Sequence, residues 1–285
     1  MVSKPLGDYE AFKRWSGEPR RWGPDGAWRA WFGGKVVDGL CDVLDEHLAA
    51  PRRRGMHPAA IGCVPWLTSR AVASRLLALT SYCVVVDKAP LNKEPTVRPE
   101  LINPDKAFPN EAIYELRDLM PAVDGWAPLT IGPYTPKDAT LYGIEPVRVL
   151  GWRKRNDEQK PIPHAKLLVL GEVGVESFGP DFAPDSYEEC RFTPQRVWFG
   201  SANWTGGARY HLETGFVCDD PLLAEQATSF VAEMIAFSEP VDSACVGPEP
   251  NLVRVGYDDD AIASAAQELG YDVPDDYEEP YDYEP

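Results

Sequence analysis

The feature that most constrains the fold is a strand–helix–strand pattern near the start of the chain. Apolar runs cover residues 59–67 and 83–87, and a helical segment at 70–79 follows Thr68 and Ser69, a typical helix start. Two strands joined by so short a helical connection pair in parallel, and parallel strands are buried on both faces. The pattern therefore predicts an α/β domain whose mixed β-sheet is flanked by helices on both faces.

The rest of the chain supplies further elements for this domain. Apolar residues near helical spacing predict an amphipathic helix at 35–49, and shorter or longer helices are expected at 111–120 and 222–237. Further strands are expected at 146–152, 165–171, 196–202 and 213–220. No internal repeat is evident, so we expect one copy of the domain per chain.

Composition divides the chain into three parts. Residues 1–34, rich in Trp, Arg, Gly and Pro, are expected to be an irregular extension packed on the domain by its aromatic rings rather than a base-stacking platform. Residues 35–255 are expected to form the domain. Residues 256–285 combine Asp, Glu, Tyr and Pro and are predicted to be an acidic, largely disordered tail. Such a tail could solubilise the protein, cover a basic groove or dock a partner.

The net charge and the lack of targeting signals exclude few functional classes. The formal net charge is −17, but eleven acids and no Lys or Arg follow Arg254, so residues 1–255 carry only −6. The N-terminus has no apolar signal-peptide core, and no stretch is long and apolar enough to span a membrane. The six cysteines lack metal-ligand spacing, and Cys63, Cys83 and Cys218 fit buried, reduced positions. We expect a cytoplasmic protein without a metal site or cofactor and without a membrane partner.

Three predicted strands carry side chains suited to phosphoryl transfer. Alternate residues of a strand share a face, so His164 points with Lys166, Ser201 with Asn203, and His211 with Glu213. A histidine can act as nucleophile or proton donor, ammonium and amide groups can hold phosphate oxygens, and a carboxylate can orient an imidazole. Each half of this pattern alone is weak, because Ser and Asn after Gly often form turns. The two halves together indicate a catalytic surface.

The segment His164-Ala-Lys166 followed by Gly200-Ser201-Ala-Asn203 resembles the HxK…GSxN motif of the phospholipase D superfamily. Glu213 resembles the acidic residue that supports the histidine of that family, and the likeness extends over roughly residues 35–240. The resemblance implies catalytic roles for His164, Lys166, Ser201, Asn203 and Glu213. It implies a metal-independent phosphodiesterase that works through a phosphohistidine, and a homodimer, because one chain carries only one HxK and the site needs two histidines.

Two departures from the family pattern concern the segment after the histidine. The family Asp, seven residues after the His, is replaced by Gly171, with Glu172 one position late. The spacing from His164 to Ser201 is longer by 22 residues than in the uninterrupted family pattern. We place this insertion within residues 172–195 as a hairpin beside the site, where it could select substrate.

Other polar residues are candidates for binding the substrate. His211, where the family commonly has Asn, is either an extra polar group of the pocket or a rim histidine. Arg153, Lys154 and Arg155 precede the motif strand and either grip a polyanion backbone or form a solvated loop.

The motif leaves three functional hypotheses. A nuclease acting on nucleic acid is favoured, because no apolar membrane-binding surface is evident and basic residues precede the motif. The second is a silent or regulated subunit of a larger nucleic-acid-processing or phage-defence complex. The third is a phospholipid phosphodiesterase, which would require an apolar rim.

Overall fold

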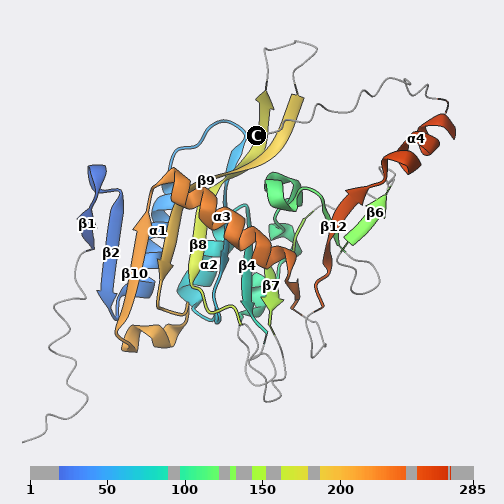
Figure 1. Ribbon diagram of the computed structural model, residues 1–285. Helices are drawn as coiled ribbons and strands as arrows, with labels where there is room; N and C mark the ends of the chain where they lie inside the picture. Colours follow the sequence, from blue (N-terminus) through green and yellow to red (C-terminus); the bar gives the residue numbers. More distant parts are fainter. Residues whose placement is uncertain are drawn as a thin grey trace, which may run out of the picture.

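The structure is a computed structural model, and it describes residues 19–88, 97–121, 129–132, 143–151, 162–178, 187–241, 249–268 and 270. Its centre is a nine-stranded mixed sheet with the strand order β1-β2-β10-β9-β8-β3-β4-β7-β11 (Figure 1). The pairs β3–β4 and β4–β7 are parallel and the other neighbours are antiparallel. The strands are β1 (Arg20–Trp22), β2 (Trp28–Gly33), β3 (Met56–Cys63), β4 (Ser81–Asp87), β7 (Val147–Leu150), β8 (Leu167–Phe178), β9 (Tyr187–Gly200), β10 (Glu213–Cys218) and β11 (Glu239–Pro240).

Helices cover both faces of this sheet, which confirms the predicted layering. The helices α1 (Val36–Ala49) and α2 (Arg70–Ala78) pack on one face, where alternate strand residues such as Ala60 and Val84 meet them. The helix α3 (Pro221–Ala236) crosses the other face, against the intervening residues such as Ile61 and Val85 (Figure 1). Because alternate residues of the central strands point to opposite faces of the sheet, each face has its own apolar core.

Local sequence signals explain where the helices begin. Ser69 caps α2, its hydroxyl accepting a hydrogen bond from Val72 N at 3.4 Å, as the Thr68–Ser69 signal predicts. Asp220 caps α3 by accepting from Leu223 N at 2.9 Å, and Pro221 fits the first helical position because it needs no hydrogen-bond donor there. Such caps satisfy backbone groups that the helix itself leaves unpaired.

Two expectations about secondary structure are wrong. Residues 20–22 and 28–33 are not irregular but form β1 and β2, and β2 pairs with β10 along its whole length. Aromatic packing of this segment is nevertheless confirmed, since the rings of Trp31 and Trp198 lie 5.2 Å apart. In place of a helix at 111–120 the chain forms the 3₁₀ turns Asn110–Ala112 and Tyr114–Leu116 and then β5 (Leu119–Pro121). Apolar burial of Ala112, Ile113 and Leu116 under α3 decides this conformation over helical propensity.

The beginning of the acidic tail is ordered. The strand β12 (Leu252–Tyr257) pairs with β5 and with β6 (Leu129–Gly132) in a small second sheet, and the helix α4 (Asp259–Glu268) follows. Asp258 starts this helix by accepting from Ala261 N at 3.0 Å. Helix α4 has no buried residue, so local capping rather than packing accounts for it. Residues 271–285, the core of the predicted tail, lie outside the described residues.

Two further expectations, one about the cysteines and one about membrane-spanning segments, can be compared with the described part of the chain. Cys63, Cys83 and Cys218 are buried and unpaired as predicted, and burial raises the pKa of the Cys83 thiol to about 12. Within the described residues, no helix is long and apolar enough to cross a lipid bilayer.

Candidate active site

The two halves of the motif meet where β8 begins and β9 ends. These strands are antiparallel neighbours with Leu167 opposite Phe199, and Gly200 N donates to Lys166 O at 3.1 Å. On the other side of β8 lies β3, which is antiparallel to β8 and parallel to β4. It ends at the same edge of the sheet, with Cys63 opposite Leu167. The motif therefore sits at the carboxyl edge of the parallel strands, the position at which open α/β sheets bind ligands.

The structure brings His164 and Lys166 together, although not as alternate residues of a strand. Both precede β8, His164 at the surface and Lys166 only 7% exposed. The Lys166 ammonium donates to His164 O at 2.8 Å and lies 3.3 Å from each ring nitrogen of that histidine. Burial lowers the pKa of Lys166, and the Glu213 carboxylate opposes this shift. A cation thus stands directly beside the candidate nucleophile.

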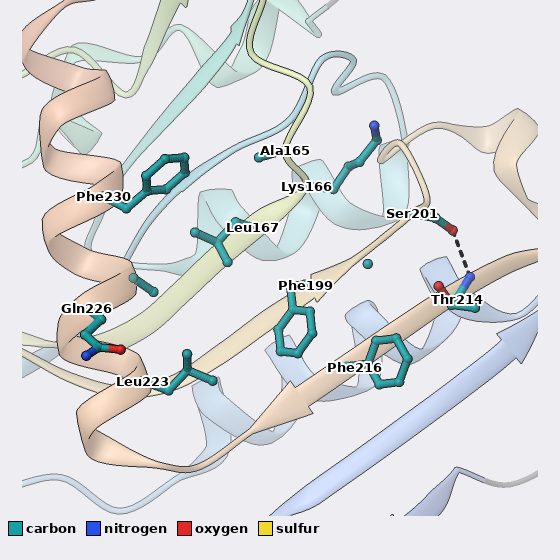
Figure 2. A pocket seen from close by; sticks show the side chains of 12 residues that line it. Ala165, Lys166, Leu167, Phe199, Ser201, Thr214, Phe216, Leu223, Gln226 and Phe230 are labelled. Carbon is teal, nitrogen blue, oxygen red and sulfur yellow. Dashed lines mark hydrogen bonds between the residues drawn. The ribbon is translucent and has the colours of Figure 1, made fainter.

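Ser201 and Glu213 form a second polar pair, at the point where β9 ends beside β10. A Cβ atom at Gly200 would lie 2.3 Å from Thr214 O, so only glycine permits this approach of the two strands. Thr214 N donates to Ser201 Oγ at 2.9 Å, a bond drawn in Figure 2, and the Ser201 hydroxyl donates to the Glu213 carboxylate. The backbone of β10 and the Glu213 side chain together orient the serine hydroxyl.

The interactions of Glu213 differ from those that the family resemblance implies. Among the described residues, Glu213 interacts with Ser201, with His211, whose Nδ1 lies 3.8 Å from its carboxylate, and through charge with Lys166. No hydrogen bond joins it to His164 of the same chain. The carboxylate therefore connects the serine, the lysine and a second histidine instead of orienting the first.

Asn203 lies in a loop held against the segment after β3. Trp204 N donates to Trp66 O at 3.1 Å, and Thr68 N and Ser69 N donate to Trp204 O at 3.0 and 2.8 Å. The Asn203 side-chain oxygen is buried and has no hydrogen-bond partner among the described residues. An unpaired buried polar atom is costly, and such atoms often occur at functional sites.

Of the residues expected to bind substrate, only His211 lies in the described part of the chain. His211 lies at the rim with 69% of its side chain exposed, and Glu213 is its neighbour. Arg153, Lys154 and Arg155 lie outside the described residues. Among the residues that the structure describes, no group of three or more His, Cys, Asp or Glu side chains could hold a metal ion.

The packing of β8 and β9 explains why Gly171 stands where the motif that the chain resembles has Asp. A Cβ atom at Gly171 would lie 2.4 Å from Thr193 O, at a bulge in the pairing of the two strands. An aspartate cannot occupy this position without moving the strand. The neighbouring Glu172 is buried instead, with its carboxylate 3.9 Å from Arg52 Nε.

The inserted segment does form a hairpin, but the expectation that it lies beside the site is wrong. It extends β8 and β9, which run to Phe178 and from Tyr187, and it projects beyond the sheet (Figure 1). At about 3.3 Å per residue, the 12 residues of β8 place the far end of the strand about 36 Å from its motif end. The described far ends of the two strands therefore lie well away from the motif of their own chain.

An apolar groove along α3 borders the motif, and sequence reasoning missed it. One hollow of about 620 Å³ is lined by Lys166 and Ser201 together with Phe199, Phe216 and Phe230. A second hollow of about 920 Å³ borders His164. The available signal was the spacing of Leu223, Phe230 and Phe237, which recur every seven residues outside the buried stripe of α3.

Comparisons with known proteins give structural similarities only. No protein-family model and no curated protein matches the chain. The chain is similar to NucT from Helicobacter pylori at 12% identity over 75% of this chain and 98% of that one, with a TM-score of 0.45. It is similar to a phospholipase D family member, Nuc from Salmonella typhimurium, at 13% identity over 76% and 93% of the chains, with a TM-score of 0.34. A polyphosphate kinase from Porphyromonas gingivalis matches at 12% identity over 93% of this chain and 31% of that one, with a TM-score of 0.36.

Proposed function

We propose that this chain is a metal-independent phosphodiesterase of the phospholipase D type, acting as a nuclease. The observation that carries the proposal is the convergence of His164, Lys166, Ser201 and Glu213 at one edge of the sheet. These residues come from three segments separated by up to 49 positions, and hydrogen bonds connect them in two pairs. Structural packing alone has no need for a buried ammonium beside an exposed imidazole.

The proposed reaction has two steps. In the first, a nitrogen of His164 bonds to phosphorus and the bond from phosphorus to the leaving ester oxygen breaks. A second histidine gives its proton to that oxygen. In the second step this histidine takes a proton from water, and the resulting oxygen nucleophile displaces the imidazole and releases the phosphate monoester.

The neighbouring side chains would stabilise charge during both steps. The Lys166 ammonium and the amide of Asn203 would hold the non-bridging phosphate oxygens. The Ser201 hydroxyl donates its one proton to Glu213 and accepts from Thr214 N, so it would bind the same oxygens by turning that proton away from the carboxylate. Positive charge from lysine and imidazolium would serve the purpose that a metal ion serves in other phosphodiesterases.

The second histidine would come from a second copy of the chain. Because each chain has a single HxK segment, a two-fold dimer with its axis at the site would bring two copies of His164 together. His211 would then be a rim residue whose neighbour is Glu213. Sedimentation equilibrium should give twice the chain mass, and a strict monomer at micromolar concentration would contradict the shared site.

The apolar groove supports one alternative activity. Phe230 and Phe237 are 49% and 64% exposed beside the motif, which is the apolar rim that a phospholipid phosphodiesterase requires. Hydrolysis of phosphatidylcholine vesicles would support this activity, and turnover of nucleic acid alone would exclude it.

The direct test is cleavage of labelled single- and double-stranded DNA and RNA in excess EDTA. The wild-type protein should cut at least one of them, and His164→Ala should abolish the cutting. His57→Ala is the matched control, because His57 is exposed near the start of β3, at the opposite end of that strand from the motif. Loss of cutting in EDTA, or persistence of cutting in His164→Ala, would refute the mechanism. No turnover of any phosphodiester by a folded dimer would favour the silent or regulated subunit.

A further inference from the structure

The groove beside the motif consists of two hollows that meet at one aromatic side chain. Phe230 and Ala165 line both of them, the hollow of about 620 Å³ and the hollow of about 920 Å³. Phe230 projects from α3 toward the strand that carries the motif, and its side chain is 49% exposed (Figure 2). The ring therefore stands between two spaces on the surface of the protein.

The smaller hollow has an aromatic floor and a nearly uncharged lining. Its floor includes Phe199 and Phe216, whose rings stack with centroids 5.4 Å apart and planes at 19° (Figure 2). One wall is α3, which contributes the amide of Gln226. Lys166 and Ser201 stand at the end nearest the motif, and among the described lining residues Lys166 is the one charged group. Such a surface suits a flat, uncharged ring with hydrogen-bonding edges. Apart from Lys166 of the motif, its described lining has no charged group that could bind a further phosphate.

The larger hollow begins on the other side of Phe230. Ile162, Pro163 and His164 form one side of it, so the candidate nucleophile lies at its border. The C-terminal turns of α3 form another side and contribute the exposed ring of Phe237. His164 thus faces one hollow while Lys166 and Ser201 face the other.

We propose, on the basis of the proposed function, that the substrate is single-stranded nucleic acid whose two bases next to the scissile phosphate enter one hollow each. A phosphate bound by His164, Lys166 and Ser201 has two ester substituents that diverge from it, and the hollows extend in two directions from these residues. Phe230 separates the two bases and stacks on at least one of them. Bases of a duplex are paired and stacked on their neighbours, so they cannot enter the hollows without melting.

The test uses a single strand that contains its own control. A fluorescent 20-nucleotide oligothymidylate with one abasic residue at its centre is cut under single-turnover conditions, and the products are mapped. Stacking of a base on an aromatic side chain gives about a tenfold advantage or more, so the linkages flanking the abasic residue should be cut about tenfold more slowly than the others. Cutting at equal rates along the strand would overturn the proposal. So would equal rates for the strand alone and annealed to its complement.

The variant Phe230→Ala should reduce cleavage about tenfold and remove the discrimination against the abasic position. Leu222→Ala is the control, because Leu222 is an apolar α3 residue with 63% exposure that lines neither hollow, and it should change neither readout. If Phe230→Ala also dissociates the dimer, the groove is an interface between copies. If Phe230 is needed for turnover of phosphatidylcholine vesicles, the occupant is an acyl chain. Either result would overturn the proposal.

A binding measurement separates this inference from the proposed function. If neither DNA nor RNA is cut, the proposed function fails, yet the fluorescence anisotropy of the same oligothymidylate still reports on the groove. The His164→Ala protein should bind the intact strand more tightly than one with several abasic residues, and adding Phe230→Ala should remove the difference. Equal binding of both strands would overturn the groove assignment by itself.

Discussion

The two ends of the β8–β9 pair differ in what their side chains do. At the motif end, Lys166 is buried beside an exposed histidine, and polar groups face a groove. At the hairpin end, charged residues pair across the surface, as Arg53 does with Glu176 at 2.6 Å. One pair of strands thus carries a costly polar cluster at one end and ordinary surface pairing at the other. The difference sets the motif end, with its buried ammonium, apart from a hairpin end that carries ordinary surface ion pairs.

The largest effect should come from Lys166→Gln at the motif end. Loss of the ammonium beside the phosphate should lower kcat about 10²- to 10³-fold. Because burial lowers the pKa of Lys166, the folded state disfavours its charged form at neutral pH, and the neutral variant should have an equal or higher melting temperature. Lys106→Gln is the control, since Lys106 donates to Leu79 O at 2.8 Å away from the motif. A parallel loss of stability and activity in Lys166→Gln would assign the lysine a structural role.

Gly171→Asp, which introduces the residue of the motif that the chain resembles, should destabilise the middle of the strand pair. A Cβ atom there would lie 2.4 Å from a backbone oxygen, and the new carboxylate would be buried, so we expect a loss of about 3–5 kcal/mol in the free energy of unfolding. Urea denaturation measures it. Gly206→Ala, where an added Cβ meets nothing within 4 Å, should change stability by less than about 0.5 kcal/mol. A stable Gly171→Asp protein would show that the bulge adapts.

The free energy of unfolding should depend on pH through the buried His47. Burial, helped by the charges of Arg52 and Arg196, lowers the pKa of His47 to about 4. The unfolded chain takes up this proton near pH 6.5, so the stabilising contribution is complete above that pH and is lost as the pH falls toward 4. The loss amounts to at most about 3.5 kcal/mol. His47→Gln should flatten the stability profile between pH 6.5 and 4, and an unchanged slope would mean that other groups dominate it.

The smallest effect on activity should come from shortening the hairpin. Replacing residues 175–190 by a two-residue Asn-Gly turn would join Gly174 to Arg191, which are directly paired. We expect kcat/KM of the variant to stay within about threefold of wild type, because loop ends tolerate such changes and this one is about 30 Å or more from the motif. A large change in KM with an intact fold would show that the hairpin does select substrate, by acting at the site of the partner copy in a dimer.

Local sequence patterns determined the central layers and the set of site residues. The alternation in β3 and β4 predicted strands buried on both faces, and Ser69 marked the start of α2, because both signals depend on neighbours within a few residues. The sequence also predicted neighbouring strands for the two halves of the motif, and β8, which begins just after Lys166, pairs with β9, which ends just before Ser201. It follows from these patterns that His164, Lys166, Ser201 and Glu213 approach one another.

Tertiary structure alone decided the features that depend on distant partners. The strand β2 needs β10 as its partner, and the direction of the hairpin depends on how far β8 and β9 remain paired. Which carboxylate oxygen meets Ser201, and where α3 leaves Phe230 exposed beside the motif, depend on the packing of elements far apart in the sequence. Periodicity specifies which face of an element is buried, but not what lies against it, and the groove arises from that second choice.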